Sequence, residues 1–108
     1  MDLNPRIKLP AEIQKGEVFV IKTLVTHPME NGRRKDADGS LIPRKIINLF
    51  TCKFNGQPVF EAKLDTAVST NPYIEFYAKV AEAGTFAFAW TDDDGTVTMA
   101  EQKVTLKG

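Results

Sequence analysis

The sequence predicts an all-β fold, an antiparallel sandwich of about seven short strands. Apolar and polar residues alternate with period two in several runs, as strands do when one side is buried. Asn-Gly and Asp-Gly dipeptides separate some of these runs, and both favour tight hairpin turns. No long stretch has the period of an amphipathic helix, and 108 residues suit a single domain, which we assign to residues 1–108.

The first two predicted strands are Arg6–Leu9, which Pro10 ends, and Glu17–Val25. The second is rich in β-branched and aromatic residues, which favour strands. Both of its faces are apolar, and Val18 and Val20 lie on the same one. A strand face in contact with water alternates more cleanly, so we expect a loop or another protein to cover the second face.

A long loop is predicted after His27-Pro28, because the residue before a proline is pushed towards extended or turn geometry. The loop spans Met29–Arg44 and contains turn signals at residues 31–32 and 38–39 among many charges. Loops of this length in a compact domain are usually functional or mobile.

The third and fourth predicted strands form a hairpin about the turn at Asn55-Gly56. They are Ile46–Phe54 and Pro58–Leu64. Strict alternation in the third strand places Ile47 and Leu49 on the face opposite its phenylalanine and cysteine side chains. One end of this strand is therefore apolar on both sides, which again indicates cover on the outer face.

The remaining predicted strands are Tyr73–Val80, an aromatic strand with Phe86, Phe88 and Trp90, and Val97–Leu106. The three large rings share one face and need a facing layer to remove them from water. Asp94-Gly95 supplies the hairpin turn after them. An immunoglobulin-like antiparallel β-sandwich fits this pattern best, without the disulfide of antibody domains because the chain has one cysteine.

The charge balance limits the classes of partner. Fourteen basic and fourteen acidic side chains cancel, whereas nucleic acid and anionic membranes favour a basic excess, so neither is expected. No apolar run approaches the roughly 20 residues of a membrane span. Residues 1–15 lack the apolar stretch of a secretory signal, so we expect a cytosolic chain or one exported with another chain's help.

Few residues could carry chemistry. Cys52 lies between phenylalanines on a strand, which predicts a buried and inert thiol. His27 is the only histidine, too few for a zinc site, and we expect it in a surface turn. The run Asp92–Asp94 lacks the ligand spacing of a calcium loop and predicts a hairpin turn with solvated charges. No metal or cofactor motif is present, and no cofactor is expected.

The long loop holds the one basic cluster of the chain, formed by Arg33, Arg34 and Lys35 with Arg44 and Lys45 at its far end. Most charge runs are solvated faces. The alternative is docking of an acidic partner or anion, for which the guanidinium group of arginine is suited. No aromatic side chains interleave with the cluster, as they do in sites for single-stranded nucleic acid.

Three stretches resemble one known family when taken together. They are residues 21–32 with His-Pro-Met-Glu at 27–30, residues 42–56, and residues 71–95 with Trp-Thr-Asp-Asp-Asp-Gly at 90–95. The chain resembles the SoxZ family, the small subunits of the sulfur-oxidising (Sox) carrier complex, over nearly its whole length. The family is immunoglobulin-like in fold, which agrees with the strand pattern.

The resemblance implies a non-catalytic partner of SoxY, with which it forms a heterodimer. SoxY carries thiosulfate-derived sulfur on a cysteine in a flexible C-terminal tail and presents it to cytochromes and hydrolases of the pathway. The end of the present chain, residues 104–108, has no cysteine, so this chain is not the carrier. The family's chain crosses the membrane with SoxY, whose signal serves both, which implies a periplasmic location by co-export.

The resemblance also gives two expectations about surfaces. We expect an outward apolar patch to pack against SoxY, formed by Ile47 and Leu49 together with Val18 and Val20. We expect the exposed, charged loop to guide enzymes of the pathway to the complex. Its candidate docking residues are His27, Met29, Arg33, Arg34 and Arg44.

Two other classes of function stay open. In one, Cys52 itself acts as a direct sulfur carrier or redox group, and slow, denaturant-dependent thiol labelling would argue against it. In the other, the chain is a generic adhesion or ligand-binding sandwich in which Trp90 and the tyrosines stack on sugars. Rings on strands are more often part of the core.

Overall fold

The computed structural model describes residues 3–10, 12–68 and 70–106 of the chain. Within these residues the regular structure consists of seven strands, and there is no helix. Each strand lies close to the bounds expected from the sequence. The strands are β1 (Arg6–Lys8), β2 (Phe19–Leu24), β3 (Ile47–Phe54), β4 (Gln57–Lys63), β5 (Tyr73–Ala78), β6 (Gly84–Asp92) and β7 (Val97–Val104).

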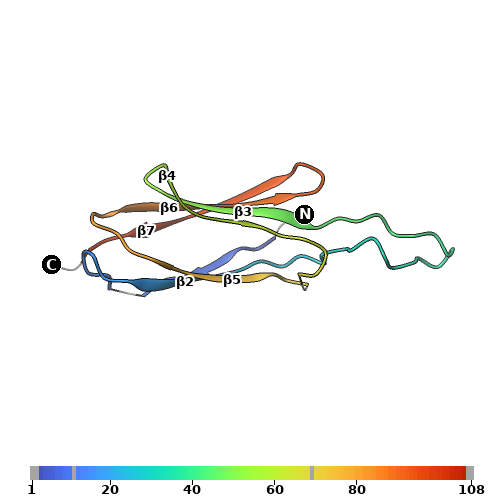
Figure 1. Ribbon diagram of the computed structural model, residues 1–108, viewed down its shortest axis with the longest axis horizontal. Coiled ribbons are helices and arrows are strands. Elements are labelled where there is room, and N and C mark those ends of the chain that lie inside the picture. The colour runs from blue at the N-terminus through green and yellow to red at the C-terminus, as the bar shows by residue number, and fades with distance from the viewer. Residues whose placement is uncertain (1–2, 11, 69, 107–108) are drawn as a thin grey trace.

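The strands form two antiparallel sheets that pack face to face, as Figure 1 shows. The small sheet has the order β1-β2-β5 and the large sheet the order β4-β3-β6-β7. The β3–β4 hairpin turns at Asn55 and Gly56, whose φ angles are 50° and 83°, as the sequence predicts. The predicted all-β, immunoglobulin-like sandwich is therefore confirmed.

The core lies between the sheets and is built around the aromatic strand. Phe86, Phe88 and Trp90 of β6 are each at most 1% exposed. The ring of Phe60 on β4 stacks on Phe76 of β5 with centroids 4.4 Å apart, which joins the two sheets at one edge. Period-two alternation on β6 thus directs one large ring after another into the same layer.

Residues 29–45 leave the sandwich as a long extended projection, here called the arm (Figure 1). The backbones of Glu30 and Lys45 exchange hydrogen bonds of 2.9 and 2.8 Å, and Lys35 forms an antiparallel bridge with Leu41. The arm extends beyond one end of the sheets, and the molecule measures 61 × 20 × 20 Å. The loop expected at Met29–Arg44 is thus a narrow two-stranded projection.

A β-bulge at the start of β3 corrects one expectation. Ile47 pairs with Asp92, and the next pair along the ladder is Leu49 with Thr91, so β3 holds one extra residue. The extra residue reverses the alternation, which places Ile47 and Leu49 on opposite faces. Ile47 is 0% exposed and belongs to the core, so its expected outward position is wrong.

Candidate partner-binding surfaces

A buried histidine fixes the root of the arm. His27 is 1% exposed, and its Nε2 lies 2.6 Å from Oδ2 of Asp92. The backbone N–H of Met29 donates to Nδ1 of His27 at 2.8 Å. Because Nδ1 accepts this bond, Nε2 carries the proton and donates it to the carboxylate. The expected surface position of His27 is therefore wrong, and the side chain ties the arm to β6.

The next aspartate holds the other side of the arm's root. Nε of Arg44 donates to Oδ2 of Asp93 at 2.9 Å, and Nδ2 of Asn48 donates to Oδ1 at 3.0 Å. The backbone N–H of Ile46 donates to Oδ2 at 3.1 Å. These hydrogen bonds, the one from Arg44 foremost, lower the pKa of Asp93 to about 2.

The third aspartate completes the set. Oδ2 of Asp94 lies 3.3 Å from Nζ of Lys45, and Oδ1 accepts the backbone N–H of Thr96 at 2.9 Å. The Thr96 bond is the main reason that the pKa of Asp94 is lowered to about 2. The hairpin turn is as expected, but its charges are not simply solvated. Asp92–Asp94 hold both sides of the arm's root, and we call them the aspartate clamp.

The outer part of the arm keeps free positive charge. Arg34 is paired with Glu30 through Nε at 3.1 Å. No ion pair holds Arg33 or Lys35 in the described part of the chain. Opposite Lys35 in the bridge, Leu41 is 60% exposed. The outer part of the arm therefore presents an exposed leucine beside an unpaired lysine.

The expected docking residues therefore divide into three groups. His27 and Met29 are buried, and Sδ of Met29 accepts the backbone N–H of Ile47 at 3.4 Å, so neither can touch a partner. Their expected exposure is wrong. Arg34 and Arg44 are exposed but already paired within the chain. Arg33 alone of the five combines exposure with an unpaired charge in the described residues.

The thiol of Cys52 is shielded from water. It is 0% exposed, and burial raises its pKa to about 12. Since the thiolate is the nucleophile, such a thiol is unreactive, as the strand pattern predicts. Trp90 is also buried, so it cannot stack on a sugar, whereas Tyr73 and Tyr77 lie at the surface.

The outer side of the small sheet, here called the small-sheet face, is partly apolar. In β2 the residues that alternate with the buried Phe19 and Ile21 point outwards, and the same holds for β5. Across the two strands Val20 pairs with Tyr77, and Leu24 pairs with Tyr73. The face comprises Arg6, Lys8, Val18, Val20, Lys22, Leu24, Tyr73, Glu75, Tyr77 and Lys79.

The outer side of the large sheet, here called the large-sheet face, is flatter. Its middle holds small side chains such as Ala87 and Ala89 of β6. Leu49 lies at one end, and Met99 of β7 is 67% exposed. The face includes Leu49, Thr51, Lys53, Glu61, Lys63, Thr85, Ala87, Ala89, Thr91, Val97, Met99, Glu101 and Lys103, and Val59 of β4 is 41% exposed at its edge.

The patch expected from the sequence is therefore not one surface. Val18 and Val20 lie on the small-sheet face, Leu49 lies on the opposite side of the sandwich, and Ile47 is in the core. A single flat partner cannot cover both outer faces at once. The two exposed tyrosines, which were considered above for sugar binding and not for the docking patch, are detectable in the sequence as large rings on an otherwise polar strand face.

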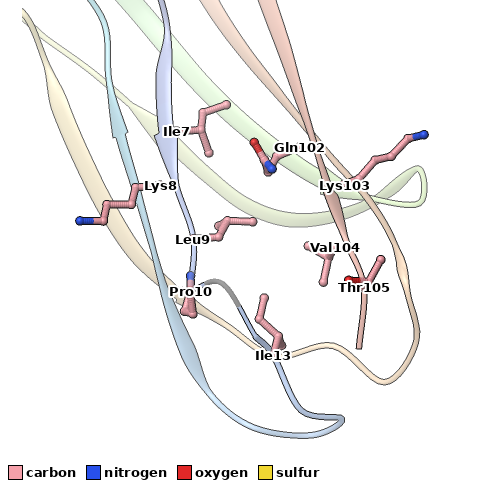
Figure 2. Close-up of a pocket in the computed structure, with 9 residues that line it drawn as sticks. All are labelled: Ile7, Lys8, Leu9, Pro10, Ile13, Gln102, Lys103, Val104 and Thr105. Carbon is pink, nitrogen blue, oxygen red and sulfur yellow. The ribbon is translucent and has the colours of Figure 1, made fainter. Parts of the chain in front are cut away.

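A hollow of about 290 Å³ opens between the edge strands β1 and β7. Figure 2 shows Leu9, Ile13 and Val104 pointing towards it, while the amino groups of Lys8 and Lys103 point away. The hollow thus brings no catalytic group to its interior. In the described residues no three His, Cys, Asp or Glu side chains gather as metal ligands, and no helix could cross a membrane.

Comparison with protein families gives one match. The family model described as sulphur oxidation protein SoxZ matches residues 7–103, which include all but the first residue of β1 and the last of β7. The match also contains the arm and the aspartate clamp. A search of curated proteins finds no significant match.

Solved structures with a similar fold include two proteins of different function. A superoxide reductase (neelaredoxin) from Ignicoccus hospitalis aligns with a TM-score of 0.72 and 14% identity, covering 95% of this chain and 80% of that one. The sulfur carrier protein SoxY from Chlorobium limicola f. thiosulfatophilum aligns with a TM-score of 0.67 and 10% identity, covering 96% and 79%. At these identities the likeness is one of fold.

Proposed function

Because the chain belongs to the SoxZ family, and so to the Sox sulfur-oxidation system, we propose that it is the non-catalytic subunit that binds SoxY. In this role it supports the subunit whose cysteine carries sulfur intermediates during thiosulfate oxidation. The observation that carries the proposal is the family match over residues 7–103. Because the chain is similar in fold to a SoxY structure, the two subunits would both be β-sandwiches.

The chemistry of the chain supports a scaffold over a carrier. Its one cysteine, Cys52, is enclosed in the core with a pKa of about 12, so it cannot reach a sulfur donor while the domain is folded. Neither His27 nor Asp92 is open to a substrate, because each is used in the buried contact at the arm's root. The exposed features are apolar faces and the arm, which suit protein partners.

Co-purification tests the proposal directly. We would co-express this chain with tagged SoxY from the same organism and expect a heterodimer by size-exclusion chromatography with light scattering. After incubation with thiosulfate and the pathway's oxidising enzymes, intact mass spectrometry should find added sulfur on SoxY alone. Failure to bind a folded SoxY would overturn the proposal, and so would covalent sulfur on this chain.

We further propose that the complex works in the periplasm and reaches it by co-export with SoxY. Fractionation of cells that express this chain with SoxY should place it in the periplasm. Deletion of the SoxY signal should retain both chains in the cytoplasm. Export that is unchanged by the deletion would contradict the co-export route.

The arm is the feature that supports transient binding of the pathway's other enzymes. It projects from the sandwich, and contacts to both of its sides hold its root, so the sandwich sets the place from which the arm extends. Arg33 and Lys35 are its unpaired cations in the described residues. We propose that they steer acidic surfaces of these enzymes towards the complex.

A further inference from the structure

We propose that SoxY docks on the small-sheet face, and not on the large-sheet face. The inference rests on the proposed function, since it names the surface that the subunit uses. It is needed because the residues that suggest a docking patch in the sequence divide between two opposite faces. Three features separate the faces: their exposed rings, their relief and their charge.

The first feature is exposed aromatic surface. Tyr77 is 74% exposed, Tyr73 is 55% exposed, and Val18 beside them is 61% exposed. Each tyrosine stands directly opposite an apolar side chain of β2, Val20 or Leu24, and the charged pair of Lys22 and Glu75 lies between these two apolar pairs. Tyrosine is enriched at interfaces because it contributes a large ring and a hydroxyl group at little entropic cost. The large-sheet face has no aromatic residue.

The second feature is relief. A shallow hollow of about 190 Å³ lies between β1 and β2 and is lined by Leu24, Tyr73 and neighbouring residues. A second, of about 150 Å³, lies beside Val20 and Pro10. Recesses of this kind can receive side chains of a partner, and buried anchors in such recesses carry much of the energy of an interface.

The third feature is charge. The small-sheet face carries four cations, Arg6, Lys8, Lys22 and Lys79, and one anion, Glu75, which stands directly opposite Lys22 in the middle of the face. The docking surface of SoxY should therefore combine apolar side chains, which meet the two tyrosine pairs, with an excess of carboxylates. On the large-sheet face three lysines oppose two glutamates, so that face has little preference for either sign.

The likeness of fold fits this choice of partner. A SoxY structure aligns with 96% of this chain at a TM-score of 0.67, so that SoxY has a sheet face that corresponds in fold to the small-sheet face. Two similar sandwiches can pack face to face about an approximate twofold axis, as subunits of symmetric dimers do. The exposed rings of one subunit would then lie against the sheet of the other.

The experiment compares matched charge insertions on the two faces. Tyr77→Glu and Val18→Glu place a carboxylate on the small-sheet face, and Met99→Glu places one on the large-sheet face at a residue that is 67% exposed. Since all three side chains lie at the surface, the fold should survive, which circular dichroism and thermal unfolding verify. The dissociation constant for tagged SoxY is then measured by biolayer interferometry.

We expect Tyr77→Glu and Val18→Glu each to weaken binding at least about tenfold, and Met99→Glu to change it less than about twofold. Leu49→Arg should likewise leave the complex intact. Charge reversal at Lys8 and Lys22 should slow association most at low salt. Loss of binding in Met99→Glu or Leu49→Arg with the tyrosine variant unaffected would overturn the inference and select the large-sheet face.

The two proposals fail in different ways. If the unaltered chain does not bind SoxY, the proposed function falls and this inference falls with it. If the unaltered chain binds SoxY and every small-sheet variant binds equally well, only the inference is overturned. Hydrogen exchange of the unaltered complex gives a second readout, because protection on binding should appear in β2 and β5 and not in β7.

Discussion

Replacement of His27 by alanine should be the most damaging single change at the arm's root. His27 donates to Oδ2 of Asp92 and accepts the backbone N–H of Met29, and no other donor reaches the carboxylate's Oδ1 in the described residues. The variant therefore leaves a buried carboxylate that has lost its charge-stabilising partner. It also creates a cavity where the ring stood.

The size of the effect follows from the burial of this pair. Losing a buried hydrogen bond from a neutral ring to a carboxylate costs about 1.5–3 kcal/mol, and the cavity left by the ring adds to this cost. A domain of this size has a total stability of about 5–15 kcal/mol, so the variant should lose a substantial part of it. Urea denaturation followed by Trp90 fluorescence measures the change, because this one tryptophan is buried in the core.

Two controls make the result specific. The double variant His27→Ala/Asp92→Leu removes the stranded carboxylate as well, and it should regain part of the lost stability. Lys63→Ala on the exposed side of β4 should stay within about 0.5 kcal/mol of the unaltered chain. A cost below about 1 kcal/mol for His27→Ala would refute the reasoning, since it would equal an ordinary hydrogen bond.

Three further outcomes are expected. Cys52 should react with a thiol reagent only when denaturant opens the domain, because its pKa is about 12 in the folded state, and rapid labelling of the native protein would contradict this. The pKa of Asp93 is lowered from 3.8 to about 2, so its contribution to stability is complete above pH 3.8 and is lost as the pH falls towards 2. Asp93→Asn should therefore reduce the change in the free energy of unfolding between pH 4 and about pH 2. An unchanged pH dependence would show that the pairing with Arg44 contributes nothing. The double variant Arg33→Glu/Lys35→Glu should bind SoxY normally but slow turnover by the pathway's enzymes at low salt, and unchanged kinetics there would remove the arm's steering role.

Local patterns were sufficient to predict the strands and the core. The rings of Phe86, Phe88 and Trp90 repeat with period two, and nothing else in the fold competes with that signal. The turns at Asn55-Gly56 and Asp94-Gly95 were equally clear, because such dipeptides favour tight turns, and Asn55, Gly56 and Gly95 have positive φ angles in the structure. Strand faces and hairpins depend on neighbours in sequence, and such features can be derived from one chain.

The candidate surfaces could not be derived in the same way. Leu49 was placed correctly on an outer face, but the bulge that turns Ile47 inwards has no local signature, because one extra residue leaves the apolar pattern unchanged. The burial of His27 depends on Asp92, a residue 65 positions away. The order of strands in the two sheets decides which outward residues of different strands lie on the same side of the sandwich. Period-two alternation carries no information about that order.

The position of the arm follows from the way in which its root joins the two sheets. The arm connects β2 of the small sheet with β3 of the large sheet. The aspartate clamp that holds its root lies at the end of β6 and in the turn between β6 and β7. Its direction is therefore set by the sandwich itself and does not need a bound partner. If SoxY covers the small-sheet face, the arm still projects from the end of the sheets and remains open to a second protein. Loss of the exposed contacts of Asp93 with Arg44 and of Asp94 with Lys45 should then impair the pathway's enzymes while SoxY stays bound, which separates the two surfaces by function.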